Sequence, residues 1–253
     1  MPRRRRKNRR RSRRGRFSFL YKVLSILLIC GAIVGAMTFL FRVNAIEITG
    51  VSHYSEAEIL SAAGIKQGDN LYLINKYDVA DDIFEKLPFV QSVKINRRLP
   101  ETLTIAVQEC IPVGTVKQEG GTWLISSRGK ILASVSEEEA LIYPVIDGVT
   151  LLSPAVGTTI ALGEEHRATE EKMLELFLKL EEKGMVSELR GVHMGEESMI
   201  TMDYADRFTV KFAWDADFDY KLQNLQVVIS KLEVNETGII DLTRDGVANF
   251  IPY

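Results

Sequence analysis

The residues that most often do chemistry in proteins are sparse in this chain. It has three histidines, His53, His166 and His193, and two cysteines, Cys30 and Cys110. No histidine has a cysteine, an aspartate or a second histidine at the short spacing from which one segment supplies metal ligands. The two cysteines lie in different predicted environments and give no disulfide framework. The sequence therefore predicts no metal site.

Serines, glycines and paired acids also lack the settings that catalysis needs. Ser126, Ser127 and Ser153 are outside any strand–turn–helix nucleophile elbow. The glycines at 120–121 precede a strand, whereas a phosphate-binding loop opens a helix. Acidic pairs fall on predicted helix surfaces or loops: Glu137/Glu138, Glu164/Glu165 and Glu181/Glu182. We predict no catalytic and no cofactor-binding residue, which favours a binding role.

Composition and charge describe a folded protein with a cationic tail. The 253 residues are 46% hydrophobic and 26% charged, which excludes a fibrous or wholly disordered chain. Residues 1–22 contain 12 Lys/Arg and no acid, so the net charge of −2 hides an acidic remainder with 20 Lys/Arg against 34 Asp/Glu. We expect residues 1–22 to form a basic, disordered tail.

Residues 23–41 carry no charge and follow the tail directly. As a helix they span about 28 Å, close to the hydrocarbon thickness of a bilayer. The positive-inside rule places the tail in the cytoplasm and exports the chain from about residue 42. The sequence therefore predicts a single-pass protein whose folded part is extracytoplasmic.

Three other targeting signals match residues 1–41 less well. A cleaved signal peptide has a shorter apolar run, and the small residues at 34–36 lie inside the run instead of after it. Bulky Ile29 stands where a lipoprotein site before Cys30 needs a small residue. A twin-arginine address at 12–14 carries little weight among so many arginine pairs.

The tail and the span each suggest a contact. Cations beside a membrane bind anionic lipid, which we favour over nucleic acid, the alternative for an arginine-rich tail. Gly31 and Gly35 form a GxxxG pair, so we predict that they permit close packing against another membrane helix.

Residues 43–110 have the pattern of a small sheet covered by two helices. A short strand at 43–48 precedes a helix that starts at Ser55 and ends at Gly64. Asn75 caps a second helix that Pro88 ends. Alternating apolar residues at 89–95 and 103–107 predict a hairpin, giving the order β-α-α-β-β.

These residues resemble the POTRA domain of bacterial cell-division proteins of the FtsQ/DivIB type. The resemblance rests on an ordered set of short motifs: Ile46-Glu-Ile-Thr-Gly50, Gly68-x-Asn70-Leu71, Leu87-Pro88-Phe89-Val90, Val93-x-Ile95-x-Arg97-x-Leu99-Pro100 and Val107-x-Glu109-x-x-Pro112. It covers roughly residues 17–250. The family usually has an arginine after the glutamate, where this chain has Cys110, so we expect a local salt bridge to be absent.

Residues 111–253 form a second predicted unit, the β domain of the resemblance. Helices are predicted at 164–183 and about 216–232, and a hairpin at 198–212. Two last strands are predicted at 239–242 and 247–253. The fold class is therefore α+β: a membrane helix, a POTRA domain and a mixed sheet domain.

The last predicted strand is the candidate partner site. An unpaired strand edge can accept a strand of another chain, and the resemblance implies docking of an FtsB/DivIC-like partner there. The candidate residues are Val247, Ala248, Asn249, Phe250, Ile251 and Tyr253. The alternative is that this strand only closes its own sheet.

The resemblance implies a non-enzymatic protein of the division septum. It would stabilise a complex with FtsL-like and DivIC/FtsB-like proteins and help to regulate septal peptidoglycan synthesis. Two other classes remain open: a membrane-anchored cell-wall enzyme, which needs a cleft of converging titratable groups, and a POTRA-bearing transport component, which predicts repeated units or a barrel.

Overall fold

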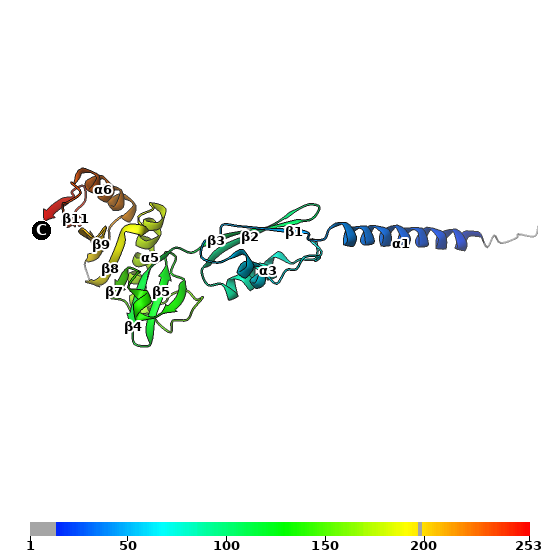
Figure 1. Ribbon diagram of the computed structural model, residues 1–253, viewed down its shortest axis with the longest axis horizontal. Helices are drawn as coiled ribbons and strands as arrows, with labels where there is room; N and C mark the ends of the chain where they lie inside the picture. The colour runs from blue at the N-terminus through cyan, green and yellow to red at the C-terminus, as the bar shows by residue number, and fades with distance from the viewer. Residues whose placement is uncertain (1–13, 197–198) are drawn as a thin grey trace, which may run out of the picture.

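The computed structural model describes residues 14–196 and 199–253 (Figure 1). Most of the predicted basic tail, residues 1–13, lies outside the described part. Helix α1 (Arg14–Leu40) begins well before the predicted span at residue 23. Its apolar part, Phe19–Leu40, has a mean hydropathy of 2.5 and is long enough to cross a bilayer.

The small domain, residues 41–110, has the predicted β-α-α-β-β order. Its elements are β1 (Ala45–Thr49), α2 (Glu56–Ala63), α3 (Lys76–Lys86), β2 (Val90–Arg98) and β3 (Thr102–Glu109). The strands lie in the order β1-β3-β2, with β1 parallel to β3 and β2 antiparallel to it. Helices α2 and α3 cover one face and share a single core with the sheet.

Local signals explain where these elements start. The Ser55 hydroxyl accepts the Glu58 N–H and the Glu58 carboxylate accepts the Ser55 N–H, so a reciprocal capping box opens α2. The Asn75 side chain accepts the Tyr77 N–H at the start of α3. Both caps satisfy amides that have no partner within the helix.

The large domain, residues 111–253, is a mixed nine-stranded sheet with helices on one face. Its elements are β4 (Pro112–Gln118), β5 (Gly121–Ser126), β6 (Ile131–Val135), α4 (Glu137–Ala140), β7 (Val145–Asp147), α5 (Arg167–Glu182), β8 (Leu189–Glu196), β9 (Met199–Tyr204), β10 (Phe208–Ala213), α6 (Phe218–Lys231), β11 (Gly238–Asp241) and β12 (Asn249–Pro252). The strand order is β12-β11-β10-β9-β8-β7-β4-β5-β6. Pairs β4/β7, β7/β8 and β10/β11 are parallel.

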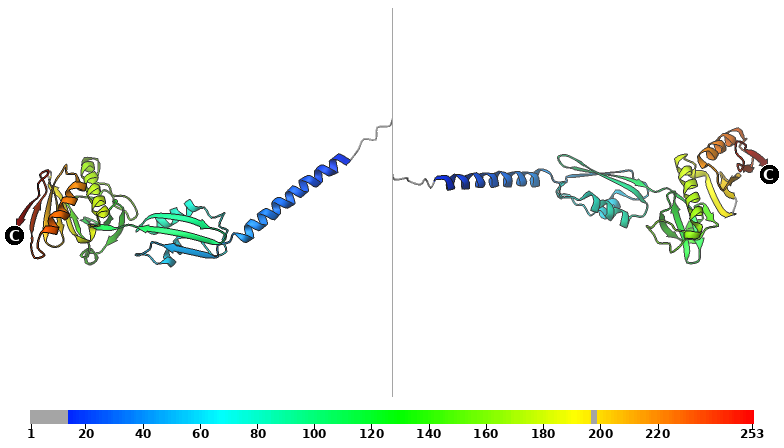
Figure 2. Two further views of the ribbon diagram at one scale, coloured as in Figure 1. Left: turned by 90° about the horizontal axis from the view of Figure 1, so that it is seen from above. Right: turned by 180° about the vertical axis from the view of Figure 1, so that it is seen from behind.

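Helices α5 and α6 bury their apolar stripes against the middle of this sheet, and Figure 2 shows both on the same face. In α5 the buried residues are Met173, Leu176, Phe177 and Leu180. Helical spacing predicts an inward stripe of Met173, Leu174, Phe177, Leu178 and Leu180, but Leu176 is buried while Leu174 and Leu178 are only partly buried. The acidic segment at 137–139 forms a short exposed helix, α4, which is capped by Ser136.

The two domains meet at a packed junction without a spacer. Cys110, the last residue of the small domain, is buried and donates its N–H to the Phe89 carbonyl of the same domain at 2.7 Å. Across the junction, the Lys130 ammonium of the large domain donates to the Val90 carbonyl of the small domain at 3.0 Å. Leu124 and Leu132 of the large domain form an apolar cluster with Cys110. A hydrogen bond and an apolar cluster thus join the two domains.

A candidate partner-binding edge in the last strand

Strand β12 is the outermost strand of the large sheet, at the end of the molecule opposite α1 (Figure 2). It runs antiparallel to β11, with Ile251 opposite Ile239 and Asn249 opposite Asp241. No strand of the described residues lies on its other side. The edge is therefore open.

The register identifies the backbone groups that face outward. Tyr253 donates its N–H to the Thr237 carbonyl at 3.1 Å. Backbone hydrogen bonding alternates along an antiparallel pair, so Ile251 and Asn249 also bond to β11. The N–H and carbonyl of Phe250 and the carbonyl of Pro252 then point away from the sheet. Pro252 has no N–H, so it restricts a new strand to the first part of β12.

The side chains of β12 alternate between the two faces of the sheet. Phe250 points to the helix-covered face, where its ring meets that of Phe208 edge to face at 6.2 Å. Ile251 and Tyr253 lie on the other face and are 52% and 77% exposed. Phe250 therefore holds the strand in place, and the apolar surface available to a partner comes from its neighbours.

The structure divides the six predicted site residues into two groups. Asn249, Phe250 and Ile251 belong to β12, whereas Val247 and Ala248 lie in the loop before it and Tyr253 follows it. Val247 is half exposed and adds to the apolar surface beside the strand. Whether a partner contacts these six residues stays a prediction.

A buried lysine of α6 binds the loop between β11 and β12. Lys221 of α6 is 2% exposed and donates to the Arg244 carbonyl at 2.7 Å, and its ammonium pairs with Asp245 at 2.9 Å. At the start of the loop, the Thr243 hydroxyl and N–H donate to the Asp241 carboxylate and lower its pKa. Both contacts set the position from which β12 begins.

Gly238 allows the closest approach of the last two strands. A Cβ at this position would collide with the Ile251 carbonyl and come within 2.9 Å of the Phe250 ring. Only glycine leaves room for β12 to pair at this register.

Strand β6, at the opposite edge of the sheet, is partly covered by the chain itself. Ile131 donates its N–H to Thr158, Gly157 donates to Ile131, and Ile160 donates to Gly129. Residues 157–160 therefore act as a strap along the start of β6.

Sequence reasoning missed a charged cluster on the exposed face of the sheet. His193 of β8 contacts the carboxylates of Asp147 on β7 and Asp203 on β9 through its two ring nitrogens, at 2.8 and 2.9 Å. Burial acts to lower the pKa of His193, but these two hydrogen bonds outweigh it and the pKa is raised above 6.5. The sheet register, and not local spacing, brings these residues together.

The cluster continues to the end of the chain. The Thr209 hydroxyl donates to the other oxygen of Asp203 at 3.1 Å and accepts from the Tyr253 hydroxyl at 3.3 Å. A line of polar contacts thus crosses the sheet from β7 to the residue after β12.

Glu109, the glutamate of the last small-domain motif, is bound by backbone N–H groups. Glu109 accepts the N–H groups of Ser52, His53 and Tyr54 at 2.8–3.1 Å. Burial acts to raise the pKa of Glu109, but these bonds and the Ser52 hydroxyl lower it overall. The carboxylate is thus satisfied without an arginine at position 110.

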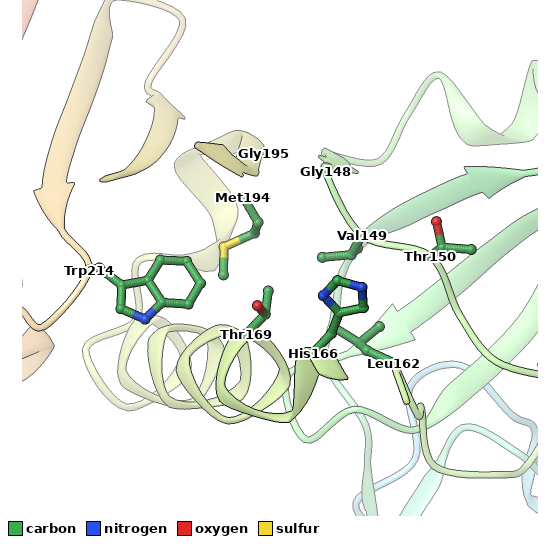
Figure 3. Close-up of a pocket in the computed structure, with 9 residues that line it drawn as sticks. All are labelled: Gly148, Val149, Thr150, Leu162, His166, Thr169, Met194, Gly195 and Trp214. Atoms are coloured by element: carbon green, nitrogen blue, oxygen red, sulfur yellow. The ribbon is translucent and has the colours of Figure 1, made fainter. Parts of the chain in front are cut away.

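A hollow of about 380 Å³ lies between the loop after β7, the start of α5 and the end of β8 (Figure 3). Met194 and Trp214 flank it, and His166 and Thr169 approach from the α5 side. Among the lining residues that the structure describes, His166 is the only ionisable one. The hollow therefore contains no acid–base pair among its described lining residues, and no hydrogen bond joins His166 to Thr150 or Thr169 there. No group of three metal-ligating side chains occurs within residues 14–196 and 199–253.

Gly31 and Gly35 lie on α1 and have no neighbour from elsewhere in the chain within 4 Å of an added Cβ. The surface that they offer to another helix is free in the monomer, and its use stays a prediction.

An apolar helix followed by a β-α-α-β-β domain and a mixed sheet with an open last strand defines the class: a POTRA protein with one candidate membrane span. Comparison with known families agrees. A model described as "POTRA domain, FtsQ-type" matches residues 41–109, and one described as "Cell division protein FtsQ/DivIB, C-terminal" matches residues 114–243. The chain belongs to the FtsQ/DivIB family of cell-division proteins.

Two distant relatives match most of the chain, and a third matches less than half of it. The cell division protein FtsQ of Corynebacterium glutamicum is 27% identical over 180 residues, covering 69% of this chain and 79% of that protein. FtsQ of Geotalea daltonii is 25% identical over 206 residues, covering 79% and 71%. DivIB of Staphylococcus aureus is 28% identical over 109 residues, covering 43% and 25%.

Proposed function

We propose that this protein is a non-enzymatic scaffold of the division machinery that binds an FtsL-like and DivIC/FtsB-like complex through the open edge of β12. The observation that carries the proposal is the outward backbone of Phe250 and Pro252, flanked by exposed Ile251 and Tyr253. A partner strand there would gain main-chain hydrogen bonds and bury apolar side chains. By holding this complex at the septum, the protein would help to regulate septal peptidoglycan synthesis.

The same proposal includes the orientation of the chain. The 12 cations of residues 1–22 support a cytoplasmic N-terminus in contact with anionic lipid, and with it an extracytoplasmic position of both domains. Accessibility of the large domain to protease in wall-stripped cells, with a cytoplasmic control protein left intact, tests the orientation.

The partner edge is tested with a matched pair of substitutions in the full chain. Ile251→Glu alters β12, and Val156→Glu alters an equally exposed residue, 45% against 52%, beside the strapped edge. We expect Ile251→Glu to weaken binding of the purified partner complex at least tenfold and Val156→Glu to leave the affinity unchanged. Neither substitution removes a buried side chain, so both chains should fold.

Crosslinking in cells adds an independent measurement. Photo-reactive residues at positions 249, 251 and 253 should capture the partner protein, and one at position 156 should not. Equal affinity of the two glutamate variants together with no capture at β12 would refute the partner edge.

A further inference from the structure

Two segments of the small domain, residues 66–77 and 97–101, lie at its end that faces α1. Ala45 of β1 pairs with Thr102 of β3, and Thr102 also pairs with Arg98 of β2. The turn between β2 and β3 therefore lies at the end where α1 enters, as Figure 1 shows. We call residues 66–77 and 97–101 the helix-proximal surface.

Helix α1 joins this surface without a linker. Phe41, the first residue after the helix, packs against the core of the small domain and meets the Tyr72 ring edge to face at 5.0 Å. Leu71 donates its N–H to the Phe41 carbonyl at 2.9 Å, and the Asn70 amide donates to the Met37 carbonyl at 3.2 Å. The loop at 66–77 is thus fixed to the last turn of the apolar helix.

These contacts determine how close the surface lies to a membrane. Met37 is three residues inside the end of the apolar stretch at Leu40, or about 4.5 Å along the helix axis. The headgroup layer on each side of the hydrocarbon core is about 5–8 Å thick. If α1 spans a bilayer with Leu40 at the edge of the hydrocarbon core, the Asn70 amide that bonds to Met37 lies at or just inside that edge, and the surface that carries Asn70 borders the headgroup layer.

The residues at this depth suit a lipid–water boundary. The side chains of Leu73, Tyr77 and Leu99 are apolar or aromatic, yet they are 82%, 81% and 53% exposed in the described chain. Tyrosine is favoured at membrane interfaces because its ring is apolar and its hydroxyl is polar. The surface itself has four cations, Lys66, Lys76, Arg97 and Arg98, and two acids, Asp69 and Glu101. Beside it, Glu47 pairs with Arg98 at 3.6 Å.

We propose that the helix-proximal surface is a lipid-binding surface whose Leu73, Tyr77 and Leu99 side chains insert into the headgroup layer of the bilayer that α1 spans. In this proposal the exposed apolar side chains, and not attraction to anionic lipid, are the source of binding. This contact goes beyond the partner edge and is independent of it. It fixes the tilt of the small domain relative to the membrane.

The test uses the full chain in vesicles of zwitterionic phosphatidylcholine that contain a nitroxide-headgroup lipid. In a Cys30→Ser, Cys110→Ala background, a polarity-sensitive fluorophore is attached to Leu73→Cys, Tyr77→Cys or Leu99→Cys. The matched control is Leu141→Cys, because Leu141 is 85% exposed but lies in the large domain. We expect the lipid nitroxide to quench each of the three labels at least threefold more than the control label.

A variant separates insertion from mere proximity. With the label at Tyr77→Cys, the pair Leu73→Asp and Leu99→Asp should reduce quenching to the level of the control, because two carboxylates oppose insertion. Both positions are exposed, so the fold is retained. The proposal is overturned if the three labels, without the aspartate pair, are quenched no more than the control label. It is also overturned if they are quenched only after anionic lipid is added.

Discussion

The two edges of the nine-stranded sheet are treated in opposite ways. At β6, residues 157–160 of the same chain bind along the edge as a strap. Leu124 of β5 and Leu132 of β6 also pack against Cys110 at the junction with the small domain. At β12 no described residue pairs with the outer backbone. Open edges promote unwanted association, so proteins usually cover or shorten them.

The difference indicates that the edge of β12 is left open to strand pairing, but only over a short length. Strand β12 has only four residues and includes Pro252, which limits how far another strand can extend along it. The contrast favours a partner for β12 in this FtsQ/DivIB protein. Three variants test it, and a fourth tests the charged cluster on the same sheet.

The largest effect is expected for Gly238→Val. The added side chain collides with the Ile251 carbonyl and displaces β12 from β11. We expect partner affinity to fall more than 100-fold and stability to fall by about 3 kcal/mol. Two measurements check this: the affinity for the partner, and hydrogen exchange of the Ile239 and Asp241 amides, which should become faster when β12 is displaced. Gly195→Ala is the control, because its added Cβ comes no closer than 3.7 Å to other atoms.

Gly157→Pro should open the strapped edge. Proline cannot adopt the φ of +87° at this position and removes the N–H that bonds to Ile131. We expect a loss of about 2 kcal/mol and concentration-dependent self-association, seen by denaturant unfolding and sedimentation. Partner affinity should stay unchanged, and a tenfold loss would show that the two edges are not independent.

Lys221→Met should loosen the loop before β12. The Arg244 carbonyl loses its donor and Asp245 its cation, while methionine fills the buried space. We expect a stability loss of about 1.5 kcal/mol and a three- to tenfold loss in partner affinity. Lys231→Met, at an exposed position of the same helix, controls for charge. Unchanged protection of the β12 amides would show that the loop does not position the strand.

The smallest effect is a pH dependence from His193. Its pKa is raised in the fold, so the stabilisation is complete below about pH 6.5 and is lost as the pH rises through the raised value. The cluster is partly solvated, so we expect less than about 1 kcal/mol. Denaturant unfolding of the native chain between pH 5.5 and 8.5, against His193→Gln, measures it. If the free energy of unfolding changes equally with pH in both chains, His193 is not the source of the pH dependence.

The sequence predicted the elements whose signals are local. The Ser55 capping box, the Asn75 cap and the alternation of β2 and β3 gave the small domain its order, which is confirmed. Strand β8 was missed because Gly191 and Gly195 interrupt its apolar pattern. Local signals work where a few neighbouring residues determine the conformation.

What the sequence could not predict depends on register. Asp147, His193 and Asp203 meet only because β7, β8 and β9 pair in one alignment, and their spacing along the chain gives no sign of it. Similarly, alternation alone did not show that Phe250 points to the core and Ile251 away from it, since a shift of one residue exchanges the two faces.

The fixed junctions on both sides of the small domain have a geometric consequence. Phe41 ties the helix to that domain, and Cys110 and Lys130 tie that domain to the large sheet. If α1 spans a bilayer, the two junctions determine how far strand β12 lies from the membrane surface. Under the proposed function, the extracytoplasmic part of a membrane-bound partner must then be long enough to reach β12.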